Sequence, residues 1–354
     1  MIKILQALPM KTFWDREPLI GLAPMDGVTD AAFRYIVDMN GKSDLLLTEF
    51  VAVEGITAGA IKLLEGFVYH PTETPTIAQI YGTEPDAFYK AAIIVAELGF
   101  DGIDINMGCP DKSVSGRGAG AGLIRTPDVA KKIVRSVKQA IQDWSEGQSL
   151  ENAGLRPKVV DAVRAMIKQY GYTAQPRILP VSVKTRTGFE TPTTKEWINH
   201  LLETEPINIT LHGRTLKQMY TGLADWEQIG IAAETAKNTK TYVMGNGDIK
   251  SLTEAKERIK TYGLHGVLIG RATFGNPWLF KDIEVDHITR LKVGLEHCRA
   301  FERLLPEGNF LSLRKHMAWY CKGFEHSAEM RVRLMTVKSA KEVEEIVAPI
   351  ISAR

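Results

Sequence analysis

Eight short β-type runs, each followed by a longer helical pattern, constrain the fold of this 354-residue chain more than any other feature. Alternating strand and helix patterns favour a parallel sheet of βα units, and eight units are the number of a closed (β/α)8 barrel. A doubly wound sheet is the alternative, but no G-x-G-x-x-G motif follows the first run. The runs span residues 19–23, 45–50, 76–81, 102–106, 179–184, 207–211, 242–245 and 266–269.

The strand pattern stops at about residue 284, and residues 291–304, 310–324 and 339–351 have the apolar spacing of amphipathic helices. We therefore predict a barrel domain over residues 1–284 and an all-helical domain over 285–354. A polar, turn-rich stretch at 145–175, with one helix at 158–170, is expected to be a surface insertion in the barrel.

Composition and charge narrow the classes of function. The first 18 residues lack the apolar core and cleavage motif of a signal peptide, and no apolar run is long enough to span a membrane. We therefore expect a cytoplasmic protein that does not contact membranes. Three scattered cysteines exclude a disulfide framework or a paired-ligand zinc site, and no metal is expected. The net charge of +2 is too small to indicate nucleic-acid binding by the whole chain.

The positive charge is nevertheless concentrated near the C-terminus. Residues 290–341 contain eleven Lys or Arg and five Glu, a local excess of six positive charges. Simple solvation of a charged surface is the favoured explanation of such an excess on its own, and contact with nucleic-acid phosphates is the alternative.

Polar or glycine-rich clusters directly follow six of the eight runs. In a (β/α)8 barrel the carboxyl ends of the strands form the active-site face, so these clusters should converge there. Each one alone is also explained as an ordinary βα turn. The clusters are Pro24-Met25-Asp26, Asn106-Met107-Gly108-Cys109-Pro110, Lys184-Thr185-Arg186, His212-Gly213-Arg214-Thr215, Asn246-Gly247-Asp248 and Gly270-Arg271.

Two of these clusters place reactive groups at the barrel mouth. Cys109 ends the fourth run before a glycine-rich segment, where a thiol can serve as a proton donor, although most such cysteines are small buried apolar residues. Cys298 and Cys321 lie in helical patterns and are expected to be structural. Lys184 follows an apolar strand, and its buried ammonium group requires an anionic partner. That partner is either an electron-rich ligand such as a reduced flavin or a carboxylate within the barrel.

The remaining clusters suit the phosphate end of a ligand. Asn246-Gly247-Asp248 and Gly270-Arg271 end the seventh and eighth strands, where such barrels often bind phosphate through backbone N–H groups. Arg271 can add a charge-assisted hydrogen bond. His212 also ends a strand, either as a ligand contact or as a structural histidine.

In order and spacing, these motifs resemble those of the tRNA-dihydrouridine synthase family, particularly its bacterial branch. Residues 313–323 are similar to the family's helical tRNA-binding domain. The barrel motifs that carry the resemblance are Ala23-Pro24-Met25-Asp26-Gly27-Val28-Thr29-Asp30, Phe33-Arg34, Ala78-Gln79-Ile80-Tyr81-Gly82, Asn106-Met107-Gly108-Cys109-Pro110, Val183-Lys184-Thr185-Arg186, His212-Gly213-Arg214-Thr215 with Gln218, Tyr220, Gly222, Ala224 and Trp226, Asn246-Gly247-Asp248-Ile249 and Ile269-Gly270-Arg271-Ala272.

The resemblance implies FMN-dependent reduction of the uridine C5–C6 bond in tRNA, with NADPH or NADH as reductant. It assigns hydride transfer from FMN N5 to C6, and proton donation from Cys109 to C5. Asn106 and Arg186 would contact the substrate. The insertion at 145–175 departs from the family's usual short connection. The implied FMN-binding residues are Pro24, Met25, Asp26, Gln79, Lys184, His212, Asn246, Gly247, Asp248, Gly270 and Arg271.

The expected partners are therefore tRNA and NAD(P)H, and we expect a monomer. Two other functions remain open at this point. One is an FMN-dependent barrel that reduces a small free enone or pyrimidine. The other is a non-catalytic RNA-binding protein that retains the barrel.

Overall fold

The structure is a computed structural model that describes residues 13–71 and 74–352; most of the N-terminal segment weighed above lies outside these residues. It confirms the (β/α)8 barrel. Eight parallel strands pair in chain order, and β8 closes against β1. They are β1 (Leu19–Leu22), β2 (Leu46–Ala52), β3 (Thr76–Tyr81), β4 (Gly102–Met107), β5 (Val181–Arg186), β6 (Asn208–His212), β7 (Tyr242–Asn246) and β8 (Gly266–Ile269). Every strand overlaps a predicted run.

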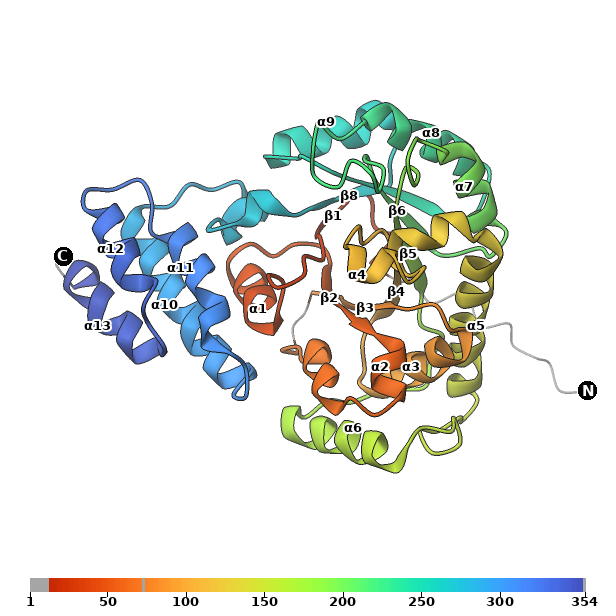
Figure 1. Ribbon diagram of the computed structural model, residues 1–354. Coiled ribbons are helices and arrows are strands. Elements are labelled where there is room, and N and C mark those ends of the chain that lie inside the picture. Colours follow the sequence, from red (N-terminus) through yellow and green to blue (C-terminus); the bar gives the residue numbers. More distant parts are fainter. Residues whose placement is uncertain (1–12, 72–73, 353–354) are drawn as a thin grey trace, which may run out of the picture.

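Helices form the outer layer of the barrel (Figure 1). Several begin at a polar N-cap; the Asp30 carboxylate, for example, accepts the Phe33 N–H at 2.8 Å. The α-helices are α1 (Ala31–Asn40), α2 (Val53–Thr57), α3 (Pro85–Glu97), α4 (Lys112–Ser115), α5 (Pro127–Ser145), α6 (Pro157–Tyr170), α7 (Thr194–Leu202), α8 (Trp226–Ala236) and α9 (Leu252–Tyr262). The 3-10 helices are η1 (Phe13–Asp15), η2 (Ile61–Phe67), η3 (Gly120–Arg125), η4 (Arg271–Thr273) and η5 (Pro277–Lys281).

The inside of the barrel has an apolar and a polar part. Leu19, Leu45, Ile77, Met244 and Leu268 form one buried cluster with Trp14. Strands β4, β5 and β6 contribute polar side chains to the inside instead. Along these strands apolar residues face outward, and the residues between them, which face inward, are polar. The buried ones are Asp104, Asn106, Ser182, Asn208 and Thr210, and the partly buried ones are Lys184 and His212.

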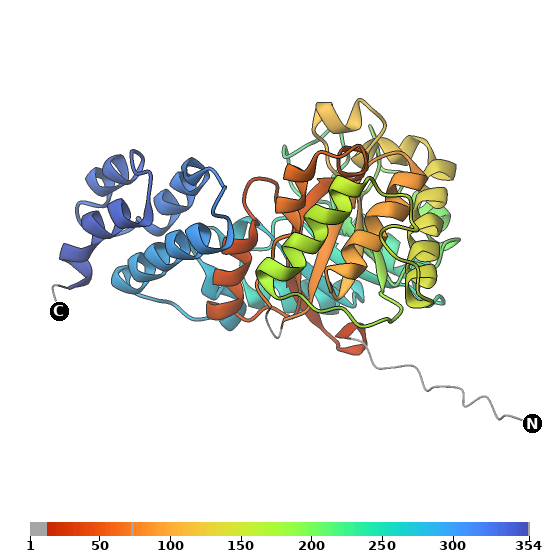
Figure 2. The ribbon, with the colours of Figure 1, turned by 90° about the horizontal axis from the view of Figure 1, so that it is seen from below.

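A helical lobe follows β8 and lies beside α1 in both views (Figures 1 and 2). It contains α10 (His287–Leu304), η6 (Phe310–Leu313), α11 (Arg314–Tyr320), α12 (Ser327–Leu334) and α13 (Ala340–Ile351). The prediction of one helix over 310–324 was wrong. The chain leaves helical geometry at Cys321, where ψ is 74°, and Gly323 has a φ of +78°. The sequence analysis also missed α12.

The predicted helix of the insertion is present as α6, one residue longer at its N-terminus. Its buried face, which includes Val159, Val163 and Met166, belongs to the main apolar core, and α6 packs against η2. The Tyr170 hydroxyl at its C-terminus donates to the Leu304 carbonyl of α10 at 2.8 Å. This helix therefore forms part of the outer layer and contacts the helical lobe.

Candidate active site

The polar strand ends converge on one cavity of about 540 Å³ at the mouth of the barrel. The ends of β1 and β4 to β8 contribute to it, together with Phe50 from β2. Gln79 alone among the predicted site residues does not line it; this side chain is fully buried and hydrogen-bonded to Asn106. The predicted residues that line the cavity are Pro24, Met25, Asp26, Asn106, Cys109, Lys184, Arg186, His212, Asn246, Gly247, Asp248, Gly270 and Arg271.

One wall of the cavity carries positive charge. Burial, together with the charge of the neighbouring Arg186 and against that of Asp104, lowers the pKa of Lys184 to about 8. Among the described residues, no carboxylate forms an ion pair with Lys184. His212 lies on the adjacent strand, and burial followed by the charge of Lys184 holds its pKa well below the usual value. The wall thus combines cations with a neutral imidazole, an arrangement that favours an electron-rich, anionic ligand.

The backbone turn that carries Cys109 is held on both sides. The Asn106 side-chain oxygen accepts the N–H groups of Gly108 and Cys109 at 3.0 and 2.8 Å. Arg186 donates to the Gly108 carbonyl at 2.7 Å. Burial raises the pKa of the Cys109 thiol, so this group carries its proton at neutral pH.

The opposite end of the cavity has a tight glycine and a bridging carboxylate. Asp248 accepts from Arg214 at 2.7 Å, from Arg271 at 2.6 Å and from the Ala224 N–H at 2.8 Å. Gly247 has a φ of +133°, and a Cβ atom there would lie 2.6 Å from the Ala224 side chain. The segment therefore requires glycine, and it leaves space and positive charge for an anionic group.

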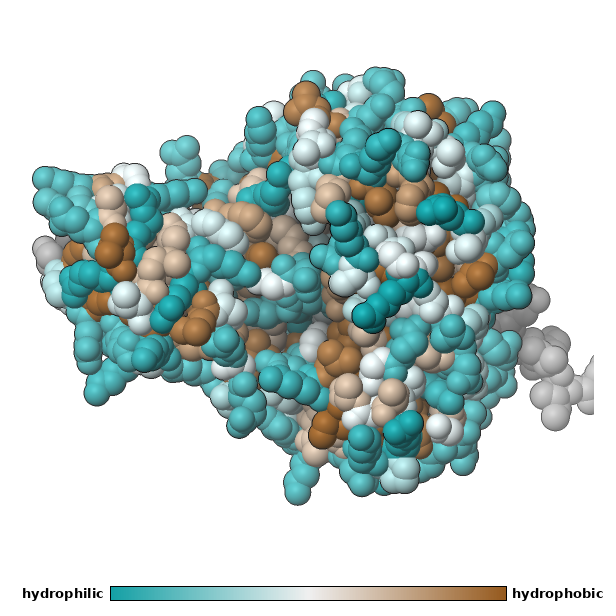
Figure 3. Space-filling view, in the orientation of Figure 1, coloured by the Kyte–Doolittle hydropathy of each residue, from teal (hydrophilic) through white to brown (hydrophobic). Residues whose placement is uncertain are grey.

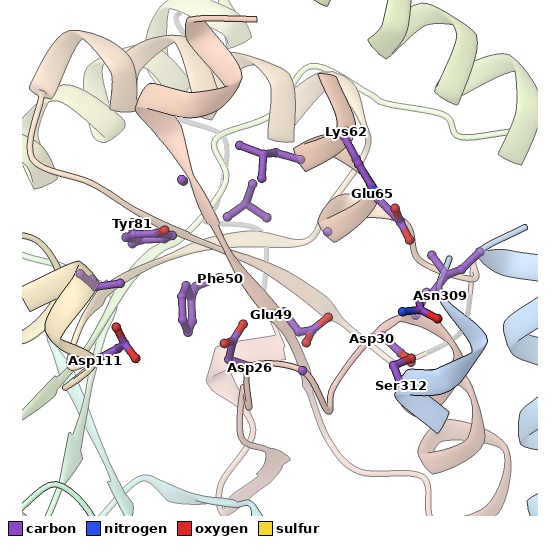
Figure 4. A pocket seen from close by; sticks show the side chains of 18 of the residues that line it. Asp26, Asp30, Glu49, Phe50, Lys62, Glu65, Tyr81, Asp111, Asn309 and Ser312 are labelled. Carbon is purple, nitrogen blue, oxygen red and sulfur yellow. The ribbon is translucent and has the colours of Figure 1, made fainter. Parts of the chain in front are cut away.

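A second hollow, of about 640 Å³, lies between the barrel and the helical lobe, and Figure 4 shows carboxylates from several elements around it. Asp26, Phe50 and Asp111 line both hollows, so the two are adjacent. Burial raises the pKa of Asp30 to about 6 and that of Glu49 to about 7. In the space-filling view the surface is hollowed between the two lobes (Figure 3).

The sequence analysis missed several residues around the cavity. Arg214 and Tyr220 line it, although the sequence analysis named them only as motif positions. Asp104 and Ser182 lie deeper and contact each other at 2.6 Å. The sequence did contain a signal for them: Asp104 lies two residues before Asn106, and Ser182 lies two residues before Lys184. Residues two apart on a strand face the same side, so each shares a face with a predicted site residue.

Within residues 13–71 and 74–352, no group of three or more His, Cys, Asp or Glu side chains is arranged to hold a metal ion. The helices in this part of the chain are also too short or too polar to cross a bilayer.

Comparison with known proteins identifies relatives over nearly the full length. A family model described as dihydrouridine synthase (Dus) matches residues 21–144 and 155–353. A probable tRNA-dihydrouridine synthase from Staphylococcus aureus (strain COL) is 32% identical over 345 residues, covering 94% of this chain and 93% of its own. Probable tRNA-dihydrouridine synthase 2 from Bacillus subtilis (strain 168) is 32% identical, covering 94% of each.

One solved structure that matches this chain is more distant in sequence. Ligand-free DHODH from Eimeria tenella is 12% identical with a TM-score of 0.48, and the match covers 75% of this chain and 81% of that one. This likeness is too weak to support a statement about function, so the sequence relatives and the geometry of the cavity carry the assignment.

Proposed function

Since the chain belongs to the dihydrouridine synthase family of oxidoreductases, we propose that it reduces uridine in tRNA to 5,6-dihydrouridine, using a bound FMN and NADPH or NADH. The names of the Staphylococcus and Bacillus relatives support tRNA as the substrate. The observation that carries the proposal is the single cavity in which the Cys109 thiol shares its walls with Lys184 and Arg186.

The residues around the cavity fit a flavin with a phosphate-bearing side chain. Lys184 offers a cation that, in the described part of the chain, feels the charge of Asp104 but forms no ion pair with a carboxylate, which suits the electron-rich ring system. Gly247 and Gly270 lie where a Cβ would crowd the neighbouring side chains, so the backbone itself forms this part of the wall, and Arg271 lies beside them for the phosphate. Pro24, Met25 and the neutral His212 complete the lining for the ring, and Gln79 supports it from below through Asn106.

The chain's own residues hold the uracil and supply its proton. A bound flavin supplies a hydride to C6 when reduced. The neutral Cys109 thiol holds the proton that C5 receives, and the hydrogen bonds around Gly108 and Cys109 fix the position of that thiol. Arg186 and Asn106 line the same wall and orient the base. The target nucleotide must leave its stack to reach the cavity, at a cost of roughly a few kcal/mol.

The helical lobe supplies the contacts to tRNA in this proposal, with residues 1–284 as the catalytic unit and 285–354 as the RNA-binding unit. Part of its positive charge serves the fold: Arg314 donates to the Val337 carbonyl, and Arg303 lies 5.0 Å above the Tyr35 ring. The exposed basic residues that remain available are Lys292, Lys322, Arg333, Lys338 and Lys341.

The test is an assay of the purified chain with unmodified tRNA and each reductant. We expect a yellow protein whose flavin absorbance bleaches with NADPH or NADH and recovers when tRNA is added, with uridine gaining two hydrogens by mass spectrometry. Protein that neither retains flavin nor can be reconstituted with FMN would overturn the proposal. Turnover with free uracil or a small enone, but not with tRNA, would support the small-molecule reductase instead.

A further inference from the structure

A chain of buried side chains runs beneath the cavity and ends at the turn that carries Cys109. Asp104 lies on β4, beside Gln79 on β3 and Ser182 on β5 in the strand register. Its two carboxylate oxygens accept from Gln79 Nε2 at 2.7 Å and from the Ser182 hydroxyl at 2.6 Å. All three side chains are at most 2% exposed, so water cannot replace these bonds.

The chain continues upward through Asn106, which lies two residues after Asp104 on the same face of β4. Asn106 Nδ2 donates to Gln79 Oε1 at 2.9 Å, and Asn106 Oδ1 accepts the N–H groups of Gly108 and Cys109. Every link from the carboxylate to the turn is therefore a direct hydrogen bond, and each amide uses both of its ends.

The direction of this chain is fixed by its two ends. An ionised carboxylate only accepts hydrogen bonds, so Gln79 must present its NH₂ group to Asp104 and its oxygen to Asn106. The backbone N–H groups of Gly108 and Cys109 only donate, so Asn106 must present its oxygen to them. A flipped amide at either position would place two acceptors or two donors face to face in a buried site.

We propose that Asp104 is a positioning residue: through Gln79 it sets the orientation of the Asn106 amide and thereby holds the backbone turn that presents Cys109. The consequence for catalysis rests on the proposed role of Cys109, whereas the relay itself does not. Burial raises the pKa of Asp104, and the hydrogen bonds from Ser182 and Gln79 and the charge of Lys184 limit the rise to about 6. Asp104 is therefore ionised at neutral pH in this arrangement.

The inference predicts a specific rescue. Asn106→Asp places a second carboxylate against the Gln79 oxygen, and Gln79 cannot turn while Asp104 accepts from its NH₂ group. In the double variant Asp104→Asn with Asn106→Asp, every link can reverse. The new amide at position 104 donates to the Gln79 oxygen, and the Gln79 NH₂ group donates to the new carboxylate at position 106, which still accepts both backbone N–H groups. The charge moves to the position that pairs with Lys184 in the register, so the barrel keeps a counter-charge.

The test measures amide hydrogen exchange of the peptide that spans residues 107–111, in the whole protein with and without FMN. For Asn106→Asp we expect exchange at Gly108 and Cys109 to be faster by about tenfold or more, or a chain that fails to fold. The double variant should fold and return to within about threefold of wild type. Asp104→Asn alone should have a smaller effect than Asn106→Asp, because its amide can satisfy Gln79 in either direction.

Single-turnover reoxidation of reduced flavin by tRNA should be slower in Asn106→Asp whether or not Asp104→Asn is present, because Asn106 also orients the base in the proposed function. Ser182→Ala is the control and is measured at pH 8, where Asp104 stays ionised without the hydrogen bond from that hydroxyl and the direction of the chain is therefore unchanged. Exchange in the double variant that is no slower than in Asn106→Asp, or a double variant that fails to fold, would overturn the inference. The exchange measurement does not depend on turnover, so failure of the relay and failure of the proposed function are distinguishable.

Discussion

The neutral, buried thiol of Cys109 is the residue on which the proposed chemistry depends most directly. We predict that Cys109→Ala retains its fold, its flavin and reduction by NADPH, while reoxidation by tRNA slows about 10²- to 10⁴-fold, the range typical of general acid catalysis. Single-turnover absorbance measurements separate the two half-reactions.

Cys298 provides a matched control for this variant, because its thiol is fully buried in the helical lobe and contacts the Met317 sulfur at 3.5 Å. Cys298→Ala should lower the melting temperature and leave reoxidation nearly unchanged. If Cys109→Ala behaves in the same way, Cys109 has a packing role and no part in proton transfer.

Lys184 supports a second prediction at this scale. Lys184→Met removes the charge and keeps an unbranched apolar side chain, so the packing should be similar. We expect this variant to lose flavin more readily or to reduce it more slowly than the wild type. Flavin content after gel filtration and the rate of reduction by NADPH measure both effects. Normal values for both would show that the ammonium group does not serve the flavin.

At the scale of elements, the junction of α1, α10 and α11 buries two neutral histidines. The His297 and His316 rings lie 4.8 Å apart and both contact Phe33. Burial lowers the pKa of His297 to about 3 and holds that of His316 well below its usual value. Below a pH of about 6.5 the unfolded chain binds protons that the folded chain excludes, so stability is greatest above that pH and falls as the pH decreases.

In His297→Phe the unfolded chain takes up about one proton fewer between pH 6.5 and 5. We therefore predict that the free energy of unfolding falls less steeply with decreasing pH than in the wild type, by about 1.4 kcal/mol per pH unit. Urea unfolding at several pH values measures it. His326→Gln is the control, because the side chain of His326 is 69% exposed. An unchanged slope in His297→Phe would mean that this histidine is protonated in the folded protein.

The elements differ in how well the sequence predicts them. All eight strands were predictable, because each carries a compact apolar run followed by turn residues. The helix predicted over 310–324 ran past the break at Cys321, although Gly323, which adopts a positive φ, is a glycine stop signal in the sequence. Most of the cavity followed from the rule that strand ends converge, whereas the Asp104 relay depends on which residues face each other across β3, β4 and β5. That register cannot be deduced from the sequence of any one strand.

At the scale of the whole molecule, the helical lobe and the barrel share one apolar core, since Phe301 and Leu304 belong to the same buried cluster as Ala31 and Phe67. Truncation before α10 would expose the α1 face that packs on it. Substitution of exposed charges is therefore the sharper test of RNA binding. We predict that changing Lys322, Arg333, Lys338 and Lys341 to Gln, singly and together, weakens tRNA binding without loss of flavin.

The physical reason is counterion release, which makes affinity fall with salt in proportion to the number of phosphates contacted. Each lysine or arginine that meets a phosphate should reduce the magnitude of the salt slope by roughly 0.7 to 0.9 when it is replaced. Fluorescence titrations with tRNA at several salt concentrations measure that slope. The matched control replaces four other exposed lysines on and around α8 and α9, which are Lys237, Lys240, Lys256 and Lys260. Both sets of substitutions lower the net charge of the chain, which is +2. A general electrostatic attraction would therefore change the salt slope in both sets alike. A local contact with tRNA would change the slope only for the substitutions in the helical lobe. Equal slopes in the two sets would remove the helical lobe from the proposed RNA-binding surface.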